Sequence, residues 1–220
     1  MPTLLLRLAG PMQSWGTTSR FDERDSQLEP SKSGVLGLVC AALGRDRAES
    51  VDDLAGLKMG VRVDREGVLM RDYQTATGVI NAAGKVDLNR TVISPRFYLA
   101  DAVFLVGLEG TDRALLERIQ AALGQPVWPL ALGRKSFPPG LPVRLLDGLQ
   151  ESSLREALAA YPLIAVPHAE HRSQALRFIV EHPSKGAIRL DQPVAPFAER
   201  RFGPRYITME AVNVPLETHP

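Results

Sequence analysis

The beginning of the chain alternates between apolar and polar stretches. Residues 4–9 form an apolar run with one charge, long enough for a core strand and too short for a buried helix. Gly10-Pro11 ends this strand, and a polar stretch without helical period follows. Ser33 is a favourable N-cap for a helix with apolar positions at Val35, Leu36, Val39 and Leu43, which Gly44 ends. The pattern predicts a strand, a long polar loop and a helix N-terminus suited to phosphate, or an ordinary strand-to-helix connection.

The middle of the chain continues with alternating strands and one helix. Leu57–Val63 reads as a strand, Gly67 turns it into Val68–Met70, and Ala102–Leu108 is apolar on both faces. Thr111 and Asp112 cap a helix with apolar positions at Leu115, Leu116, Ile119, Ala122 and Leu123, and Val127–Leu130 suggests a short strand. The resulting β-α-β-β-α-β order predicts an α+β fold of the ferredoxin-like or RRM-like type.

The segment Tyr73–Leu99 interrupts this pattern. It contains glycines, asparagines and the basic residues Lys85, Arg90 and Arg96, and it is too long for a tight turn in a compact domain. The β-branched pairs Val79-Ile80 and Val92-Ile93 suit the two arms of a hairpin. We therefore predict an inserted, projecting β-hairpin at about 73–99, with a disordered surface loop as the alternative.

The last third of the chain predicts one helix and several short strands. Ser153 and Glu156 form a capping box that opens a helix, and Pro162 closes it. A turn at Pro183–Gly186 lies between two of the strands. The strand-like runs are Val143–Leu146, Leu163–Val166, Ala175–Glu181, Ala187–Leu190 and Tyr206–Val212. We place a boundary near Gly148, which gives an RRM-like domain over residues 1–148 and a small β-rich C-terminal part over 149–220.

Composition narrows the class of protein without deciding its function. The net charge is +1 and 45% of the residues are hydrophobic, so RNA binding would depend on local basic patches rather than on the field of the whole chain. The single cysteine, Cys40, falls in the apolar helix pattern and excludes an internal disulfide. No apolar run approaches the length of a membrane span, and the N-terminus lacks the basic region of a signal peptide. We expect a soluble, cytoplasmic protein that does not bind membranes.

Two stretches of the sequence carry a specific resemblance. The run Leu6–Gly16 (LRLAGPMQSWG) and the run Pro30–Leu38 (PSKSGVLGL) resemble the beginning of the CasD family. The members of this family are RAMP-superfamily subunits of type I-E CRISPR Cascade complexes. Arg71–Thr75, Leu132–Ser136 and Arg201–Tyr206 lie where the family has similar runs, so the resemblance covers most of the chain in the same order.

The resemblance implies a function and a set of partners. It implies a non-catalytic subunit that holds and caps the 5′ handle of the CRISPR RNA in antiviral defence. The hairpin would be the family's thumb, which bends the RNA and touches the backbone subunit CasC. The large subunit CasA would lie beside the chain, and target DNA would be met only through the complex. RNA cleavage would belong to another subunit, CasE.

Other chemistry has weaker support in the residues. His168 and His171 lie in a loop without the convergent ligands that zinc needs, so we expect no metal and no cofactor. The run Gly133–Ser136 lacks P-loop spacing. A metal-free endoribonuclease that processes precursor CRISPR RNA is the main alternative, because Lys135 is available. The related cutting site has histidine beside its lysine, however, where this chain has Ser136.

RNA binding predicts a cationic track with planar groups for stacking. Trp15 can serve either as a stacking group or as a hydrophobic plug, and Arg200, Arg201 and Arg205 form a second basic cluster of undetermined role. The RNP aromatic signature is missing from Val103–Val106, which disfavours a stand-alone RRM-type RNA-binding module. A structural subunit that makes no contact with RNA is a further alternative. The predicted RNA-binding residues are Gln13, Ser14, Trp15, Arg20, Ser31, Lys32, Ser33, Tyr73, Lys85, Arg90, Arg96, Arg134, Lys135 and Ser136.

Overall fold

The computed structural model describes residues 1–17, 23–81, 83–165 and 175–213 of the chain. Helices and strands follow one another in a mixed order that is dominated by antiparallel strands. The elements are β1 (Thr3–Ala9), β2 (Met12–Gln13), α1 (Lys32–Leu43), α2 (Asp52–Ala55), β3 (Lys58–Arg65), β4 (Val68–Ile80), β5 (Val86–Ala100), β6 (Val103–Glu109), α3 (Arg113–Gly124), β7 (Arg144–Gln150), α4 (Leu154–Ala160), β8 (Leu176–His182), β9 (Ala187–Pro193) and β10 (Phe202–Val212). No helix in the described ranges is long and apolar enough to cross a membrane.

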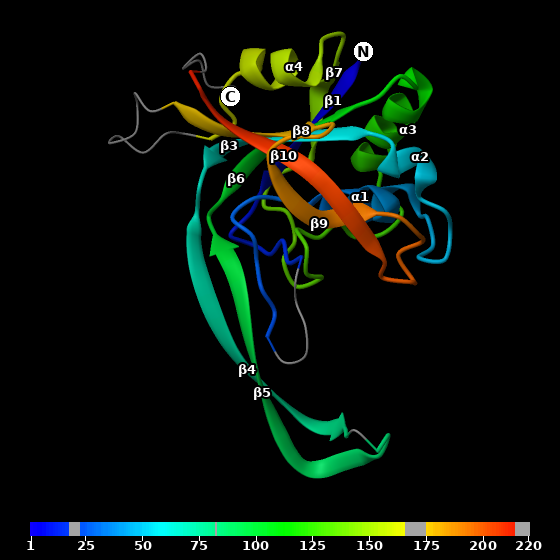
Figure 1. The fold of residues 1–220 in the computed structure, drawn as a ribbon, viewed down its shortest axis with the longest axis vertical. Coiled ribbons are helices and arrows are strands. Elements are labelled where there is room, and N and C mark those ends of the chain that lie inside the picture. The colour runs from blue at the N-terminus through cyan, green and yellow to red at the C-terminus, as the bar shows by residue number, and fades with distance from the viewer. Residues whose placement is uncertain (18–22, 82, 166–174, 214–220) are drawn as a thin grey trace.

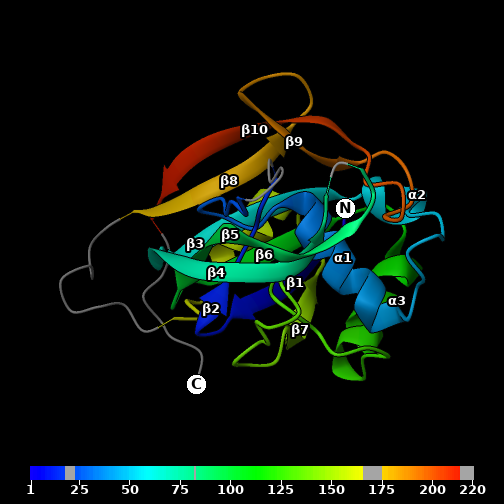
Figure 2. The same ribbon diagram turned by 90° about the horizontal axis from the view of Figure 1, so that it is seen from below.

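One large sheet organises the body of the molecule (Figures 1 and 2). Its strand order is β7-β1-β6-β3-β8-β10-β9, and all neighbouring strands pair antiparallel. Helices α1 and α3 cover one face, and α4 packs on the other face against β1, β3 and β6. Because helices cover both faces of the central strands, bases cannot stack on the β6 side chains, in agreement with the missing RNP signature.

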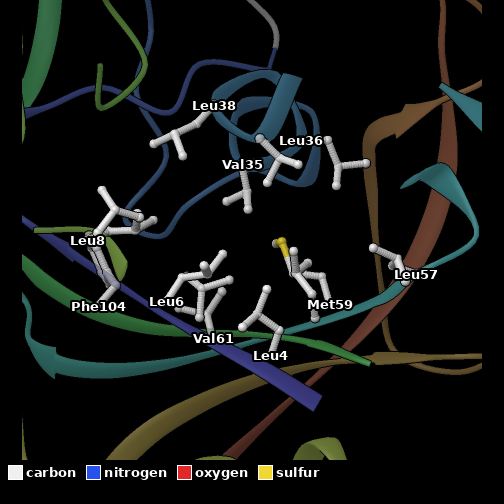
Figure 3. Close-up of a cluster of buried hydrophobic side chains, with 14 of the residues drawn as sticks. Leu4, Leu6, Leu8, Val35, Leu36, Leu38, Leu57, Met59, Val61 and Phe104 are labelled. Atoms are coloured by element: carbon white, nitrogen blue, oxygen red, sulfur yellow. The ribbon is translucent and has the colours of Figure 1, made fainter. Parts of the chain in front are cut away.

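The main core lies between α1 and the central strands (Figure 3). Leu4, Leu6 and Leu8 alternate along β1 toward α1, whereas Leu5 points to the opposite face, under α4. This follows from the two-residue period of a strand. Phe104 on β6 is also fully buried in this core, so the run that the sequence predicts as a strand apolar on both faces is confirmed.

The start of α1 differs from the sequence prediction by two residues. The N-cap is Ser31 rather than Ser33, because the Ser31 hydroxyl oxygen accepts a hydrogen bond from the Gly34 N–H at 3.3 Å. The end is as predicted: Gly44 has φ 70°, a conformation that glycine adopts at little cost. The helices predicted from Asp112 and from the Ser153–Glu156 capping box are also confirmed.

The short strand predicted at Val127–Leu130 is wrong. These residues form an irregular segment whose first two N–H groups donate to the end of α1, Val127 to the Ala42 carbonyl and Trp128 to the Ala41 carbonyl. The last carbonyls of a helix have no partner within the helix, so this segment satisfies them instead of pairing in a sheet. The strand that follows α3 in the sheet is β7, which contains the predicted run Val143–Leu146 from Arg144 onward.

A long hairpin projects from the body, as the sequence predicts (Figure 1). Its arms, β4 and β5, pair from Val68↔Ala100 to Ile80↔Val86, with a register shift between Thr77 and Val79. The hairpin therefore begins five residues earlier than predicted. At its base, β2 pairs with β5 and completes a three-stranded sheet that is separate from the large one.

The C-terminal strands extend the large sheet from β3. β8 pairs with β3, β10 pairs with β8, and β9 forms the edge. The predicted turn is present, with Gly186 at φ 103° and the Ser184 and Lys185 N–H groups donating to His182 Nδ1. Residues 163–165 form no strand, and Val166 lies outside the described residues.

Candidate nucleic-acid interface

The base of the hairpin is joined to the body by the guanidinium of Arg134. It donates to the Phe97 carbonyl on β5 at 2.9 Å and to the Arg24 carbonyl at 3.3 Å. Arg24 also pairs with the hairpin through its backbone, since its N–H donates to the Pro95 carbonyl and its carbonyl accepts from the Phe97 N–H. Arg134 lies 5.5 Å from the Phe137 ring centroid. It therefore connects three chain segments where the hairpin leaves the body.

Positive charge is concentrated at this base. Burial lowers the pKa of Arg134, and the neighbouring cations Arg96 and Arg24 lower it further, while Asp72 and Asp25 oppose them. Arginine stays charged under all practical conditions, so the lowered pKa means that like charges crowd around a partly desolvated guanidinium. An anion placed here gains from several cations at once.

A groove of about 1020 Å³ opens next to this cluster and follows α1. Its floor includes the small residues Gly34, Gly37 and Ala41 of α1. Lys135 lies at the end near the hairpin, and Arg47 at the end of the helix. The groove thus runs between two basic ends, over a helix surface where Gly34, Gly37 and Ala41 lie beside Leu38.

Lys32 is not available in this groove, contrary to the expectation for an exposed phosphate-binding lysine. Only 1% of its surface is exposed, and its ammonium group pairs with Glu181 at 3.1 Å. Burial lowers the pKa of Lys32, against the opposing effect of Glu181. Removing this side chain should therefore affect folding as well as any contact with RNA.

The free N–H groups that the sequence suggests at the start of α1 are partly occupied. The Lys32 N–H donates to the Asp191 carboxylate at 2.8 Å, and the Ser31 hydroxyl accepts from Gly34. Asp191 is buried and also receives two hydrogen bonds from Arg205, at 2.6 and 2.9 Å. A negative side chain of the protein thus occupies the position where a helix favours an anion. Ser33 is half-buried and lines the groove.

Of the first-loop residues predicted to bind RNA, three are buried and one lies outside the described residues. Trp15 is 1% exposed, with its indole N–H donating to Gln13 Oε1, and Gln13 in turn donates to the Leu8 and Ala102 carbonyls. Ser14 is buried and donates to the Phe97 carbonyl. Trp15 is thus the hydrophobic plug, and these side chains shape the surface from below. Arg20 lies outside the described residues.

The remaining predicted residues are accessible. Tyr73 is exposed on β4, Lys85 and Arg90 are exposed on the outer hairpin, and Lys135 and Ser136 are exposed on the body. Arg96 is half-buried at the base of the hairpin. The structure therefore brings Arg96, Arg134 and Lys135 to one region, with Tyr73 next to it opposite Pro95, and leaves Lys85 and Arg90 farther along the hairpin.

Sequence reasoning missed the aromatic walls of the groove. Trp128, 43% exposed, lines it on one side, and Phe197 and Phe202 line it elsewhere, with ring centroids 6.4 Å apart. An exposed tryptophan directly after a helix is a signal that could have indicated this, but the local pattern suggested a strand. In the cluster at 200–205, Arg205 is buried against Asp191 and so has a structural position.

Comparisons with known proteins agree with this architecture. The model of the family described as CRISPR-associated protein (Cas_Cas5) matches residues 3–208. The CRISPR system Cascade subunit CasD of Escherichia coli (strain K12) is 35% identical over 171 residues, which cover 72% of this chain and 76% of that protein. A solved structure described as "Crystal structure of Cas protein" is 48% identical, with a TM-score of 0.79, and the match covers 98% of this chain and 100% of the other. A chain of a CRISPR RNA-guided surveillance complex is 36% identical, with a TM-score of 0.77 over 97% of this chain and 91% of the other.

Proposed function

The chain belongs to the Cas5 family of CRISPR-associated proteins, and we propose that it is the CRISPR-RNA-binding subunit of a Cascade surveillance complex in antiviral defence. In this role it holds and caps the 5′ handle of the CRISPR RNA and does not cut RNA. One observation carries the proposal: a long hairpin leaves the body at a cluster of cations that opens into a groove.

The surface chemistry supports a single-stranded RNA ligand. Arg96, Arg134 and Lys135 supply positive charge at the hairpin base, and phosphate contacts dominate the affinity of proteins for nucleic acids. The groove is lined by aromatic as well as basic residues, which suits an unpaired strand more than a stiff duplex. We propose that the handle enters at the hairpin base and follows α1.

The exposed apolar side chains of the hairpin support a protein partner. Val68, Ile80, Val86 and Leu88 are between 60% and 79% exposed, and a series of large exposed apolar residues is typical of an interaction surface. We propose that the hairpin is a thumb that bends the RNA and contacts the backbone subunit CasC, while CasA lies beside the body. Target DNA is then met only through the assembled complex, in the cytoplasm.

We also propose that β1, α1, β3, β6, α3 and β7 form a ferredoxin-like unit. Their order along the chain and the sheet order β7-β1-β6-β3 support this assignment. The hairpin is then an insertion between the second and third strands of the unit. The division of the chain near residue 148 stays a prediction. The strands after this residue do not form a separate sheet, since β8 continues the large sheet from β3.

A ribonuclease role has less support. Lys135 is exposed, but its neighbour is Ser136 and not a histidine. His182, the histidine within the described residues, has its Nδ1 occupied by the N–H groups of Ser184 and Lys185. His168 and His171 lie outside the described residues. Incubation of the chain with repeat RNA tests this alternative: a single specific cleavage lost in Lys135→Ala would overturn the non-catalytic assignment.

The decisive experiment shortens the hairpin at a matched pair of residues. Gln74 and Ser94 lie directly opposite each other, so replacing residues 75–93 by a short Gly/Ser turn preserves the register of the base. The removed part does not belong to the main core, and closing a shorter loop costs little entropy. We expect a folded protein that no longer incorporates CasC in a reconstituted complex, measured by co-purification and native mass spectrometry.

A point substitution supplies the independent RNA readout. Lys135→Ala should reduce handle affinity and lower the slope of log affinity against log salt by about 0.7, the value for one lost contact to a single strand. Lys185→Ala, on the turn between β8 and β9, is the matched control with no expected change. Normal assembly of the shortened hairpin together with an unchanged salt slope for Lys135→Ala would refute the proposed function.

A further inference from the structure

Both aromatic walls of the groove are fixed to the end of α1. On one side, the N–H groups of Val127 and Trp128 donate to the last carbonyls of the helix, at 3.0 and 3.1 Å. On the other side, Arg47 Nη2 donates to the Phe197 carbonyl at 3.0 Å, and the Arg47 carbonyl accepts from the Ala198 N–H at 2.9 Å. These hydrogen bonds fix the backbone that carries the aromatic groups relative to the end of the helix.

The floor of the groove is open at Gly37. A Cβ atom placed there meets no atom within 4 Å, whereas a Cβ atom at Gly34 would lie 2.9 Å from the Trp15 ring. Packing thus explains the glycine at Gly34 and does not explain the one at Gly37. Glycine is a poor helix former, so a glycine in the middle of α1 weakens the helix without any gain in packing within the chain. The space beside Gly37 is therefore open to a ligand in the groove.

We propose that this part of the groove is a nucleobase subsite, in which one unstacked base of the RNA lies over Gly37 between the Trp128 and Phe197–Phe202 walls. The inference rests on the proposed RNA-binding function and adds to it the place and the chemistry of one bound base. A base has planar apolar faces for the aromatic walls, and it is attached to a phosphate that the exposed Arg47 can approach. The absence of a side chain at Gly37 lets the base approach the helix closely.

A base fits these features better than a peptide or an apolar ligand. The residues that line the groove include several cations, among them Arg24, Arg45 and Arg47, so the site as a whole favours an anionic chain. Arg45 is already paired with Asp53 through two hydrogen bonds, which leaves Arg47 as the more available cation at this end. A planar group carried on a polyanion satisfies both the walls and the charges.

Two variants test the subsite from opposite sides. Gly37→Leu fills the floor and should not lower the melting temperature, because leucine favours the helix and meets no clash at Cβ. The same variant should weaken binding of single-stranded CRISPR-repeat RNA at least about tenfold, since the base loses its position. Trp128→Ala removes one wall and should weaken binding roughly 5- to 100-fold, the range for a single stacking contact.

The readout that locates the base is fluorescence of 2-aminopurine, placed at one position of the repeat RNA at a time. One position should be quenched on binding to the wild-type protein and should recover in Trp128→Ala and in Gly37→Leu. An abasic nucleotide at that same position should cause the same loss of affinity as Trp128→Ala, with no further loss when the two are combined. Tyr206→Ala, an exposed aromatic substitution on β10 outside the groove, is the matched control with no expected change.

Failure of this inference is distinguishable from failure of the proposed function. If wild-type protein binds repeat RNA and joins the complex, but Gly37→Leu and Trp128→Ala bind with unchanged affinity, the subsite is refuted and the function stands. If wild-type protein neither binds repeat RNA nor assembles, the function itself fails. Loss of affinity in Gly37→Leu accompanied by a lower melting temperature, with Trp128→Ala unchanged, would also overturn the subsite.

Discussion

The ion pair between Lys32 and Glu181 gives the sharpest test of how the start of α1 is held. The two residues are 149 positions apart, and the ammonium group lies 3.1 and 3.2 Å from the carboxylate oxygens. Lys32→Met keeps most of the apolar stem and removes the charge. Within the part of the chain that the structure describes, the Glu181 carboxylate, 19% exposed, then keeps the Met59 N–H as its hydrogen-bond donor.

The expected cost follows from this geometry. Breaking a buried pair on one side costs about 3–5 kcal/mol, because the other charge remains buried without compensation. Partial exposure of Glu181 places the expected loss near the lower end, about 3 kcal/mol. For a chain of this size each kcal/mol lowers the melting temperature by about 2–4 °C, which predicts a fall of roughly 6–12 °C.

A double variant separates the pair from the packing. The lowered pKa of Lys32 indicates that burial costs its ammonium group more than Glu181 returns. Replacing both charges, in Lys32→Met/Glu181→Gln, should therefore recover most of the lost stability. The assay is urea unfolding followed by circular dichroism for the wild type, both single variants and the double variant, analysed as a double-mutant cycle.

The outcome that contradicts this reasoning is a small change. If Lys32→Met alters the free energy of unfolding by less than about 0.5 kcal/mol, the value usual for exposed sites, Lys32 is not buried in solution. If Lys32→Met is stable but loses RNA affinity and salt dependence, the lysine contacts phosphate, and the structural position described here is wrong. Arg201→Met, whose side chain is 68% exposed beside the 49% exposed Glu199, is the control with little expected effect.

Three further predictions concern the groove and its surroundings. Arg134→Lys should loosen the hairpin base, because one ammonium cannot reproduce the two hydrogen bonds of the guanidinium, and amide exchange at Phe97 should accelerate about tenfold; unchanged exchange would contradict this. Burial raises the pKa of the Cys40 thiol to about 11, so its reaction with a soluble disulfide reagent should be slow at pH 8 and should increase as the pH approaches 11; fast labelling at pH 8 in the folded protein would contradict this. Gly133→Ala should destabilise the chain by several kcal/mol, because Gly133 has φ 90° and a Cβ atom would lie 1.7 Å from the Ser14 carbonyl oxygen; a melting temperature equal to that of wild type would contradict this.

The sequence by itself determined the elements whose signals are local. The N-cap at Asp112, the capping box at Ser153–Glu156 and the end of α1 at Gly44 depend on residues within one turn, so a single chain segment contains the whole cause. The hairpin was predictable for a related reason: over most of Tyr73–Leu99 the apolar pattern stops, and only the base of the segment, at Tyr98 and Leu99, reaches the core. The accessible candidates Tyr73, Lys85 and Arg90 lie in this segment, whereas Lys135 is predicted from the run Gly133–Ser136.

Only the tertiary structure decided where long charged side chains lie. Lys32 and Arg62 are among the largest fully buried side chains, although both residue types are normally exposed. Their partners are distant in sequence: Glu181 for Lys32, and for Arg62 the carbonyls of Leu158, Tyr161 and Pro162 at the end of α4, together with nearby Asp64. Because a buried charge is tolerated only where such partners converge, no local pattern could indicate it.

The groove had the same non-local origin. Trp128 and Phe202 stand in segments 74 positions apart, and each is fixed in place by contacts with other elements: Trp128 with α1, and Phe202 with β9 and Phe197. The run at Val127–Leu130 has the composition of a strand, but the carbonyls of Ala41 and Ala42 at the end of α1 offered its N–H groups another set of acceptors. Hydrogen bonding to the end of a distant helix outweighed the local preference for a strand. This contact exists only in the folded chain, and it forms one wall of the groove.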